Sequence, residues 1–279
     1  MGDRAGPLRD AVRSLAPSRV LVVANGVGGA ATATELGLDV VGDTSRLSVI
    51  GTDENLGVPG GRDHGVRHTN AEIVGFLDDD AVASPGLSEA VAARFDDDAQ
   101  LGAIALRIVD EDGRTVRRHV PRFGSLDPER SGPVALFLGG ACAIRRSAYD
   151  EVGGYFTDLH YGHEEVELAW RLIDAGWNIE YLADVTVEHP RTEISRHERG
   201  WELTGRNRVW IAVRTLPRPA SWAHALAWLL LGLRRTPDRA TRDAYASGWR
   251  SGWRTAPHRT PISWRGVWRL TRRGRPPIL

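Results

Sequence analysis

Apolar residues occur along the first two thirds of the chain in short runs that alternate with segments of helical spacing. Short apolar runs bounded by turn-forming residues indicate buried strands, whereas apolar residues three and four apart indicate helices. The runs predict strands at 19–24, 39–41, 47–50, 73–77, 101–109, 135–145, 179–182 and 185–187. The helical spacing predicts helices at 7–15, 60–69, 84–95 and 164–175.

The order of these segments indicates the class of the fold. Strands and helices alternate, which is typical of an α/β domain, so the pattern predicts a largely parallel sheet covered by helices. From about residue 198 the strand pattern stops and only helical spacing continues. We therefore expect two units, an α/β domain over residues 1–198 and a helical C-terminal extension over residues 199–279.

Charge divides the chain at the same place. The 279 residues include 36 basic and 36 acidic side chains, and every basic one is an arginine. Residues 199–279 hold 17 of the arginines but only three acids, a formal charge of +14, and eight of the ten tryptophans. The preceding residues have a formal charge of −14. A basic, tryptophan-rich segment of this kind indicates contact with an anionic surface.

Composition also excludes several classes of protein. With 42% hydrophobic residues, the chain is too apolar to be disordered. A single cysteine, Cys142, rules out a disulfide framework and a cysteine metal cluster, and it fits a reducing cytoplasm. No apolar stretch in the sequence reaches the roughly 18 residues of a membrane span, and the first residues contain no apolar signal region.

The candidate chemistry lies at the ends of predicted strands. Asp78, Asp79 and Asp80 directly follow an apolar run, and His189 ends another. Ligands of open α/β sheets bind at the carboxyl ends of strands, and hard oxygen ligands favour magnesium or manganese. The first and third aspartates can reach one metal ion, whereas a solvated acidic turn is the competing interpretation. Glu165, near the start of a predicted helix, is a candidate general base.

Four motifs, in this order, resemble those of family 2 glycosyltransferases. They are NLGVPGGRDHGVRHTNAEIVGFLDDDA (55–81), FLGGACAIRRSAYDEVGGY (137–155), HEEVELAWRLIDAGW (163–177) and VEHP (187–190). The first resembles the core of that family's donor site, and the third resembles its Glu-Asp-x-Asp/Glu-Leu helix. The resemblance covers roughly residues 20–190 and is far more specific than any one motif.

The resemblance implies a GT-A fold, in which helices flank a mixed sheet, and an inverting transfer of a sugar from a nucleotide-diphosphate donor. It makes Asp78, Asp80 and His189 the ligands of a divalent metal ion, manganese or magnesium, and Glu165 the catalytic base. It also places a further set of residues at the nucleotide sugar: Asn25, Arg62, Asp79, Gly139 and Gly140.

Three features depart from the family's pattern. The family's first strand, which contributes to the nucleotide site, has no counterpart in this sequence, so we expect a longer protein or a fragment. Ala24 stands where an acid often contacts uracil, which argues against a uridine donor and makes a thymidine-diphosphate sugar plausible. The base is glutamate at Glu165 where the family more often has aspartate, and this changes its reach by one methylene.

The basic extension predicts where the protein works. Trp249 with Trp253 and Trp264 with Trp268 are spaced i, i+4 and are interleaved with arginines. This composition is typical of interfacial anchors, although the rings would equally pack against the α/β domain. We expect a lipid-linked or cell-envelope glycan acceptor, contact with an anionic membrane surface, and no nucleic-acid partner. The predicted location is cytoplasmic and peripheral on the inner face of the plasma membrane.

Two alternatives stay open at this point. A catalytically inactive family member, acting as a scaffold or binding protein, is consistent with the missing strand. Residues 26–31 match the dinucleotide fingerprint G-x-G-x-x-A and would indicate an NAD-dependent oxidoreductase. The second alternative leaves the cluster at 78–80 and Glu165 without a role, and it allows only about seven residues for the helix that should follow.

Overall fold

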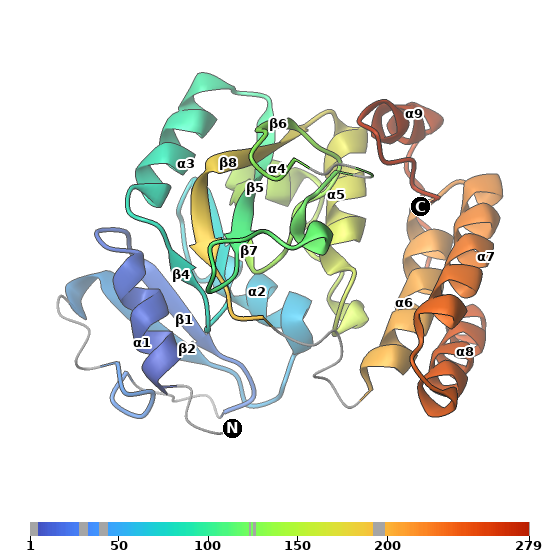
Figure 1. Ribbon diagram of the computed structural model, residues 1–279, viewed down its shortest axis with the longest axis horizontal. Coiled ribbons are helices and arrows are strands. Elements are labelled where there is room, and N and C mark those ends of the chain that lie inside the picture. The colour runs from blue at the N-terminus through green and yellow to red at the C-terminus, as the bar shows by residue number, and fades with distance from the viewer. Residues whose placement is uncertain are drawn as a thin grey trace.

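A mixed six-stranded sheet, covered by helices on both faces, organises the molecule (Figure 1). The computed structural model describes residues 5–27, 33–38, 44–122, 124, 127–191 and 199–278. In this part of the chain the strands are β1 (Val20–Ala24), β2 (Leu47–Gly51), β3 (Ile73–Leu77), β4 (Val82–Ala83), β5 (Leu101–Val109), β6 (Gly132–Pro133), β7 (Ala141–Arg145) and β8 (Asn178–Glu188). The α-helices are α1 (Ala5–Ser14), α2 (Gly57–Arg67), α3 (Leu87–Asp97), α4 (Arg146–Glu151), α5 (Glu164–Ala175), α6 (Gly200–Thr215), α7 (Arg218–Arg235), α8 (Arg239–Arg254) and α9 (Trp264–Arg272). Short 3-10 helices are η1 (Thr44–Arg46), η2 (Arg117–His119) and η3 (Thr157–Leu159).

The direction of the strands corrects the expectation of a largely parallel sheet. The main path is β3-β7-β5-β8-β4, and β6 also pairs with β8. In this sheet only β5 and β8 run parallel, whereas β3, β4, β5 and β6 each form an antiparallel pair with β7 or β8. The expectation was wrong because a strand covered on both faces is a continuous apolar run whichever way its neighbours run. The mixed sheet implied by the family resemblance is confirmed.

The predicted segments were otherwise mostly confirmed, with three differences. The run at 135–145 forms a strand only over its last five residues, because the chain turns at Gly139 and Gly140 and the Ala141 amide donates to the Leu138 carbonyl (3.1 Å). The runs at 179–182 and 185–187 belong to the single strand β8, which has a register irregularity between them. The strand expected at 39–41 lies outside the described residues.

Strand β5 shows why both faces of the sheet are buried. Ala103 and Ala105 face a cluster that includes Leu168 and Leu172 of α5. Ile104, between them in sequence, belongs to the opposite cluster with residues of α3. Successive side chains of a strand point to opposite faces, so one apolar run supplies both cores. The candidate site residues follow the ends of strands in this buried sheet.

The C-terminal helices form a bundle beside the sheet domain (Figure 1). Helices α6 and α8 pack closely because each has a glycine against the backbone of the other: a Cβ at Gly248 would lie 1.9 Å from the Glu202 carbonyl oxygen, and one at Gly205 would lie 2.2 Å from the Tyr245 carbonyl oxygen. The buried Glu167 of α5 meets the bundle, since it accepts a hydrogen bond from Thr215 (3.1 Å) and lies 3.3 Å from Nε of Arg214. The bundle thus shares contacts with the sheet domain, and the division into two domains near residue 198 stays a prediction.

None of the helices in the described residues is long and apolar enough to cross a membrane.

Candidate active site

The acidic cluster and the histidine meet at the edge of the sheet. Asp78 follows β3, and its amide donates to the Gly140 carbonyl (3.1 Å). His189 follows β8, and its amide donates to the Val109 carbonyl at the end of β5 (2.9 Å). The His189 Nε2 lies 3.2 Å from Oδ1 of Asp80 and 3.6 Å from Oδ2 of Asp78. The structure therefore brings the first and third aspartates to one imidazole, and Asp79 between them is exposed.

The carboxylates and the imidazole change each other's protonation. Hydrogen bonds to Asp78 and Asp80 raise the pKa of His189 to about 10, although burial opposes the shift. For Asp78, burial favours the neutral acid, but the His189 hydrogen bond and the positive charge of Arg62 outweigh it and lower the pKa. Near neutral pH the His189 ring is therefore protonated beside the Asp78 carboxylate.

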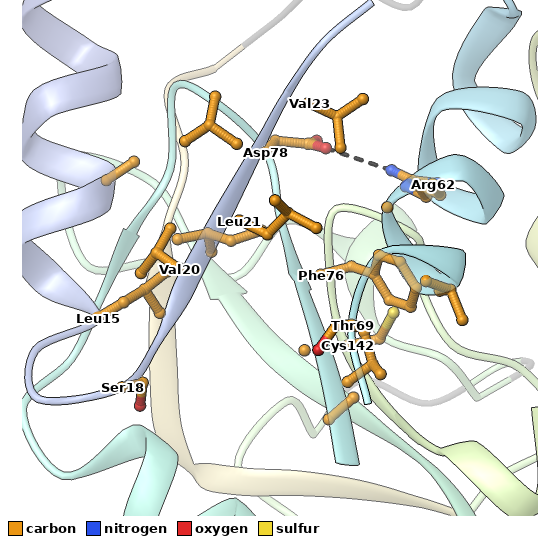
Figure 2. Close-up of a pocket in the computed structure, with 18 of the residues that line it drawn as sticks. Leu15, Ser18, Val20, Leu21, Val23, Arg62, Thr69, Phe76, Asp78 and Cys142 are labelled. Carbon is orange, nitrogen blue, oxygen red and sulfur yellow. Dashed lines mark hydrogen bonds and ion pairs between the residues drawn. The ribbon is translucent and has the colours of Figure 1, made fainter. Parts of the chain in front are cut away.

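Arg62 links this cluster to helix α5. Its Nη2 lies 3.3 Å from Oδ1 of Asp78 (Figure 2). Its Nη1 donates to Oε1 of Glu164 at 2.9 Å. Glu164 begins α5 and is only 4% exposed. A continuous series of ion pairs, which we call the site network, thus runs from Glu164 through Arg62 and Asp78 to His189 and Asp80.

The two glycines predicted at the donor sugar lie against the site network. A Cβ on Gly139 would be 2.1 Å from Nη1 of Arg62, and a Cβ on Gly140 would be 2.0 Å from Oδ2 of Asp78. Neither glycine has the positive φ that would by itself require glycine. They are needed because the turn passes directly beside the charged groups.

The predicted base, Glu165, lies half-buried in the first turn of α5. Burial raises its pKa to about 8, and the neighbouring charge of Glu164 adds to the shift. Arg62 and Arg208 act in the opposite direction. A carboxyl group with a pKa near the working pH is suited to accept a proton during a reaction.

Two residues near this base were missed by the sequence reasoning. Asn207 of α6 donates to the carbonyl oxygens of Leu159, Tyr161 and Gly162 (2.8–3.0 Å), and so holds the loop that leads into α5. Arg208 lies 3.3 Å above the ring of Trp228, and burial lowers its pKa to about 9. One signal was available, because Asn207 falls between Leu203 and Ile211 at i, i+4 spacing, in the buried stripe of the helix.

Asn25 lies at the end of β1, where its amide group connects two loops. Its Oδ1 accepts from the Leu56 amide (2.9 Å), and its Nδ2 donates to the Gly57 carbonyl (2.9 Å). These bonds place the start of α2, the helix that carries Arg62. The structure therefore brings Asn25 to the same edge as the site network, but with its side chain engaged in fixing a loop.

A hollow of about 640 Å³ separates β1 from β3. In the described residues β1 pairs only with β2, and β3 pairs only with β7, so each strand presents an open edge to the hollow. Figure 2 shows Leu21 and Phe76 on opposite sides of this space, with Asp78 and Arg62 at one end. The apolar strand β1 is half-buried over four of its five residues, as expected when one neighbour is missing.

The candidate metal ligands are residue types that bind divalent ions. Two carboxylates and one imidazole are donors that manganese and magnesium accept. In the part of the chain that the structure describes, however, no three side chains are arranged as a metal site. Asp78, Asp80 and His189 form ion pairs instead, with the protonated ring between the two acids.

Solved structures place this architecture in the class of GT-A glycosyltransferases. Residues 1–349 of TarS from S. aureus, in complex with UDP-GlcNAc, superpose with a TM-score of 0.60 at 15% identity, over 91% of this chain and 79% of that one. The mannosyltransferase PcManGT from Pyrobaculum calidifontis, in complex with GDP-Man and Mn²⁺, gives a TM-score of 0.57 at 18% identity, over 92% and 73% of the two chains. At these identities the likeness establishes the fold alone.

The sequence then assigns the family. The family model for glycosyl transferase family 2 matches residues 7–153, more than half of the chain, so the protein belongs to that family. A pre-mycofactocin glycosyltransferase from Mycobacterium tuberculosis is 31% identical over 245 residues, 83% of this chain and 51% of the relative. The O-antigen chain rhamnosyltransferase RfbN from Salmonella typhimurium is 23% identical over 208 residues, 67% and 64% of the two chains. The chain thus spans about half the length of the first of these relatives.

Proposed function

We propose that the protein is a metal-dependent, inverting glycosyltransferase that moves a sugar from a nucleotide-diphosphate donor to a hydroxyl group of a lipid-linked or cell-envelope glycan. The observation that carries the proposal is the site network, which joins the start of α5 to the ends of β3 and β8. It sets a candidate base beside a candidate metal and phosphate site, as this reaction requires.

In the proposed reaction Glu165 takes the proton of the acceptor hydroxyl group. The acceptor oxygen forms a bond to the anomeric carbon from the face opposite the donor phosphate. The bond between that carbon and the diphosphate oxygen breaks, and the nucleoside diphosphate leaves with the electron pair. The proton remains on Glu165 until it passes to solvent. The raised pKa of Glu165, about 8, suits this transfer.

The leaving group carries the negative charge that develops in this reaction. Asp78, Asp80 and His189 would hold a manganese or magnesium ion, which supplies positive charge at the diphosphate. Arg62 is placed between Asp78 and Glu164, where its guanidinium can turn towards a phosphate oxygen. Gly139 and Gly140 would leave room for the sugar beside these charges. Asn25 and Asp79 both line the hollow, and they would contact the nucleotide.

The acceptor class rests on relatives and on the charge of the extension. An N-acetylglucosaminyl-diphospho-decaprenol L-rhamnosyltransferase from Mycobacterium tuberculosis is 27% identical over 100 residues, 36% of this chain and 33% of that protein. Together with the basic extension over residues 199–279, this similarity supports a deoxyhexosyl or hexosyl donor and an acceptor on a lipid diphosphate. The proposal places this work in the cytoplasm, peripherally on the inner face of the plasma membrane, and this part rests on the charge of the extension alone.

A donor panel tests the proposal. The purified protein is incubated with UDP-, GDP- and dTDP-sugars, each with manganese or magnesium, and release of nucleoside diphosphate is measured with and without prenyl-diphosphate-linked sugars. We expect metal-dependent turnover of one donor. Glu165→Gln should still bind that donor but should lower transfer by about 100-fold or more, the range expected for losing a general base. Normal turnover by this variant would exclude Glu165 as the base.

The metal assignment has its own control. Asp80→Ala should abolish manganese-dependent nucleotide binding in calorimetric titration. Asp96→Ala is the matched control, because Asp96 also belongs to a triplet of aspartates but is exposed at the end of α3. If Asp80→Ala and Asp96→Ala bind the nucleotide and manganese equally well, the proposed metal site is wrong.

An inactive scaffold is the second candidate, and the hollow between β1 and β3 favours it. Among the described residues no strand pairs with the open edges of β1 and β3, so the side of the site near Asn25 is less firmly held there. A scaffold would bind a nucleotide sugar in the same panel and turn over none. Turnover of any donor excludes this alternative.

A further inference from the structure

Helix α7 carries a stripe of exposed residues with an unusual order. Arg218, Trp222, Leu226, Leu230 and Arg234 follow one another at i, i+4 spacing, and each step turns about 40° around the helix. Trp222, Leu226 and Leu230 therefore share one face, and the two arginines flank it, about 80° to either side of Leu226. Trp222 is 62% exposed, Leu226 58% and Leu230 62%, and both arginines are exposed. At a rise of 1.5 Å per residue the stripe is about 24 Å long, with an apolar middle and a cation at each end. We call it the α7 stripe.

The opposite side of α7 is fixed in the bundle, so the α7 stripe is held in a defined orientation. The Tyr245 hydroxyl of α8 donates to the Trp228 carbonyl (2.5 Å), and Nε1 of Trp249 donates to the Ala225 carbonyl (3.2 Å). A Cβ on Gly232 would lie 2.0 Å from the Tyr245 ring, which shows how closely the two helices pack. On another side of α7, the His224 ring packs edge to face on Trp170 of α5 at 5.4 Å, so α7 also contacts the sheet domain.

Of the two tryptophan pairs identified in the sequence, one is packed inside the bundle and the other is exposed. Trp249 and Trp253 pack edge to face at 5.7 Å within the bundle, and Trp253 stacks under the ring of Trp222 at 4.5 Å. Trp264 and Trp268 of α9 are 58% and 61% exposed. The first pair therefore supports the α7 stripe from behind, a role that spacing alone did not predict.

The C-terminal segment that contains the α7 stripe is strongly cationic. Residues 199–279 contain 17 arginines and three acids, and each of the acids has a local contact. Glu202 pairs with Arg199 (2.9 Å), Asp243 lies 3.8 Å from Arg239, and Asp238 caps α8 by accepting from the Thr241 amide (2.8 Å). The partner of this surface must supply both negative charge and apolar contact.

We propose that the α7 stripe docks on an anionic lipid bilayer, with α7 lying in the plane of the interface. Leu226 and Leu230 enter the acyl boundary, the Trp222 ring lies among the headgroups, and Arg218 and Arg234 reach lipid phosphates at both ends. This inference deepens the proposed function by naming the surface that would bring the site to a lipid-linked acceptor. It does not require that the protein transfers a sugar.

A second copy of the chain fits the α7 stripe poorly. Symmetric pairing of two stripes, parallel or antiparallel, gathers two arginines at each end of the interface, and the stripe itself contains no acid to pair with them. A bilayer offers anions along the whole length of the helix instead. Charge complementarity therefore favours lipid over self-association.

Vesicle flotation of the full chain tests the proposal. Vesicles of phosphatidylcholine with 30% phosphatidylglycerol are compared with phosphatidylcholine alone, at about 0.1 M salt to limit screening. We expect binding only to the anionic vesicles. The triple variant Trp222→Ser, Leu226→Ser, Leu230→Ser should lose at least tenfold in partitioning. Arg218→Gln with Arg234→Gln should lose about 30-fold on anionic vesicles, at about fivefold for each arginine.

The exposed tryptophans of α9 provide the matched control. Trp264→Ser with Trp268→Ser changes the same residue type on another basic helix and should leave partitioning within about twofold of the unmodified chain. If this pair abolishes binding and the triple variant does not, the docking surface is α9 and the proposal fails. It also fails if neutral vesicles bind equally well, or if the unmodified chain dimerises by light scattering and the triple variant is monomeric.

A fluorescent label keeps the test independent of any unfolding in the triple variant. Cys142 is fully buried, so Leu226→Cys introduces the one accessible thiol among the described residues. A polarity-sensitive dye on this cysteine should shift to the blue with anionic vesicles only, and an unshifted spectrum overturns the proposal. Because neither measurement involves a sugar donor, failure of the donor panel leaves the docking result intact, and the reverse also holds.

Discussion

Arg62 is the residue on which the geometry of the candidate site depends. Its two terminal nitrogens contact carboxylates from different elements, Asp78 at 3.3 Å and Glu164 at 2.9 Å, and its side chain is only 15% exposed. A planar guanidinium presents several donors at fixed angles, which a lysine ammonium does not. Arginine at this position therefore orients both acids at once and still has donors for a phosphate oxygen.

The protonation of Glu165 predicts the pH dependence of transfer. A general base acts as the carboxylate, and burial raises the pKa of Glu165 to about 8. Below that pH the protonated form is in excess, so kcat/KM should rise about tenfold per pH unit and level off above 8. Initial rates between pH 6 and 9.5 would measure this.

The Glu165→Gln variant distinguishes the titration of Glu165 from the titration of other groups. Glu165→Gln should leave only a low rate with no rising limb at about pH 8. An identical pH profile in the variant and the unmodified protein would assign the limb to another group.

Arg208 provides a second prediction at this scale. Its positive charge lowers the pKa of Glu165, so Arg208→Gln should move the rising limb of kcat/KM to higher pH and lower the rate at pH 7 by several-fold. Arg235→Gln is the control, because Arg235 lies over the same Trp228 ring at 5.3 Å but is exposed. An unshifted limb in Arg208→Gln would show that this charge does not act on the base.

The sequence predicted the site residues unevenly. Asp78, Asp80 and His189 follow apolar runs directly, so strand ends were enough to bring them together. Arg208 could not be found in this way, since its helix contains other arginines and the sequence does not show which of them is buried. Long-range packing decides which arginine is buried near Glu165, and the local spacing of residues in the sequence does not show it.

Among the elements, the turn at Gly139 and Gly140 gives a sharp prediction. Gly140→Ala needs no unusual backbone angle, but its Cβ would displace the Asp78 carboxylate. A misplacement of about 1 Å costs about 100-fold in catalysis, so kcat/KM should fall by that order. The melting temperature should stay within a few degrees, because the displaced group is a side-chain end.

A matched glycine lies on the neighbouring strand. In Gly75→Ala the new Cβ would be 4.0 Å from the Cys142 carbonyl oxygen, an ordinary contact, so kcat/KM should stay within about threefold. Equal losses in Gly75→Ala and Gly140→Ala would mean that the turn beside Asp78 has no special role.

Element boundaries were predictable where a local signal ends them. Helix α5 begins and ends as its apolar spacing and Gly176 indicate, with that glycine in the left-handed conformation at φ 111°. The segment 135–140 was wrongly expected to be a strand, because Leu136 and Phe137 are buried in a loop. An apolar residue in the sequence indicates that its side chain is buried. A buried loop therefore gives the same run of apolar residues as a buried strand.

At the scale of the molecule, the change of charge near residue 198 does not interrupt the packing. Ile211 and Leu216 of the bundle belong to the same core cluster as Leu168 of α5. Asp174 of α5 accepts from the Ser263 hydroxyl group (2.5 Å), which caps α9. Contacts of this kind hold the C-terminal bundle, and the α7 stripe with it, at a set orientation to the site network, so a docked α7 would also orient the candidate site.

The hollow between β1 and β3 has a consequence for the behaviour of the protein in solution. Open strand edges lined by apolar side chains invite association with other chains, and they bind hydrophobic dyes without unfolding. We expect the native protein to enhance 8-anilinonaphthalene-1-sulfonate fluorescence and to scatter light increasingly with concentration. Leu21→Ser, in the hollow, should reduce both signals, whereas Leu226→Ser on α7 should reduce the dye signal alone. Scattering unaffected by Leu21→Ser would mean that the hollow does not control the colloidal stability of the chain.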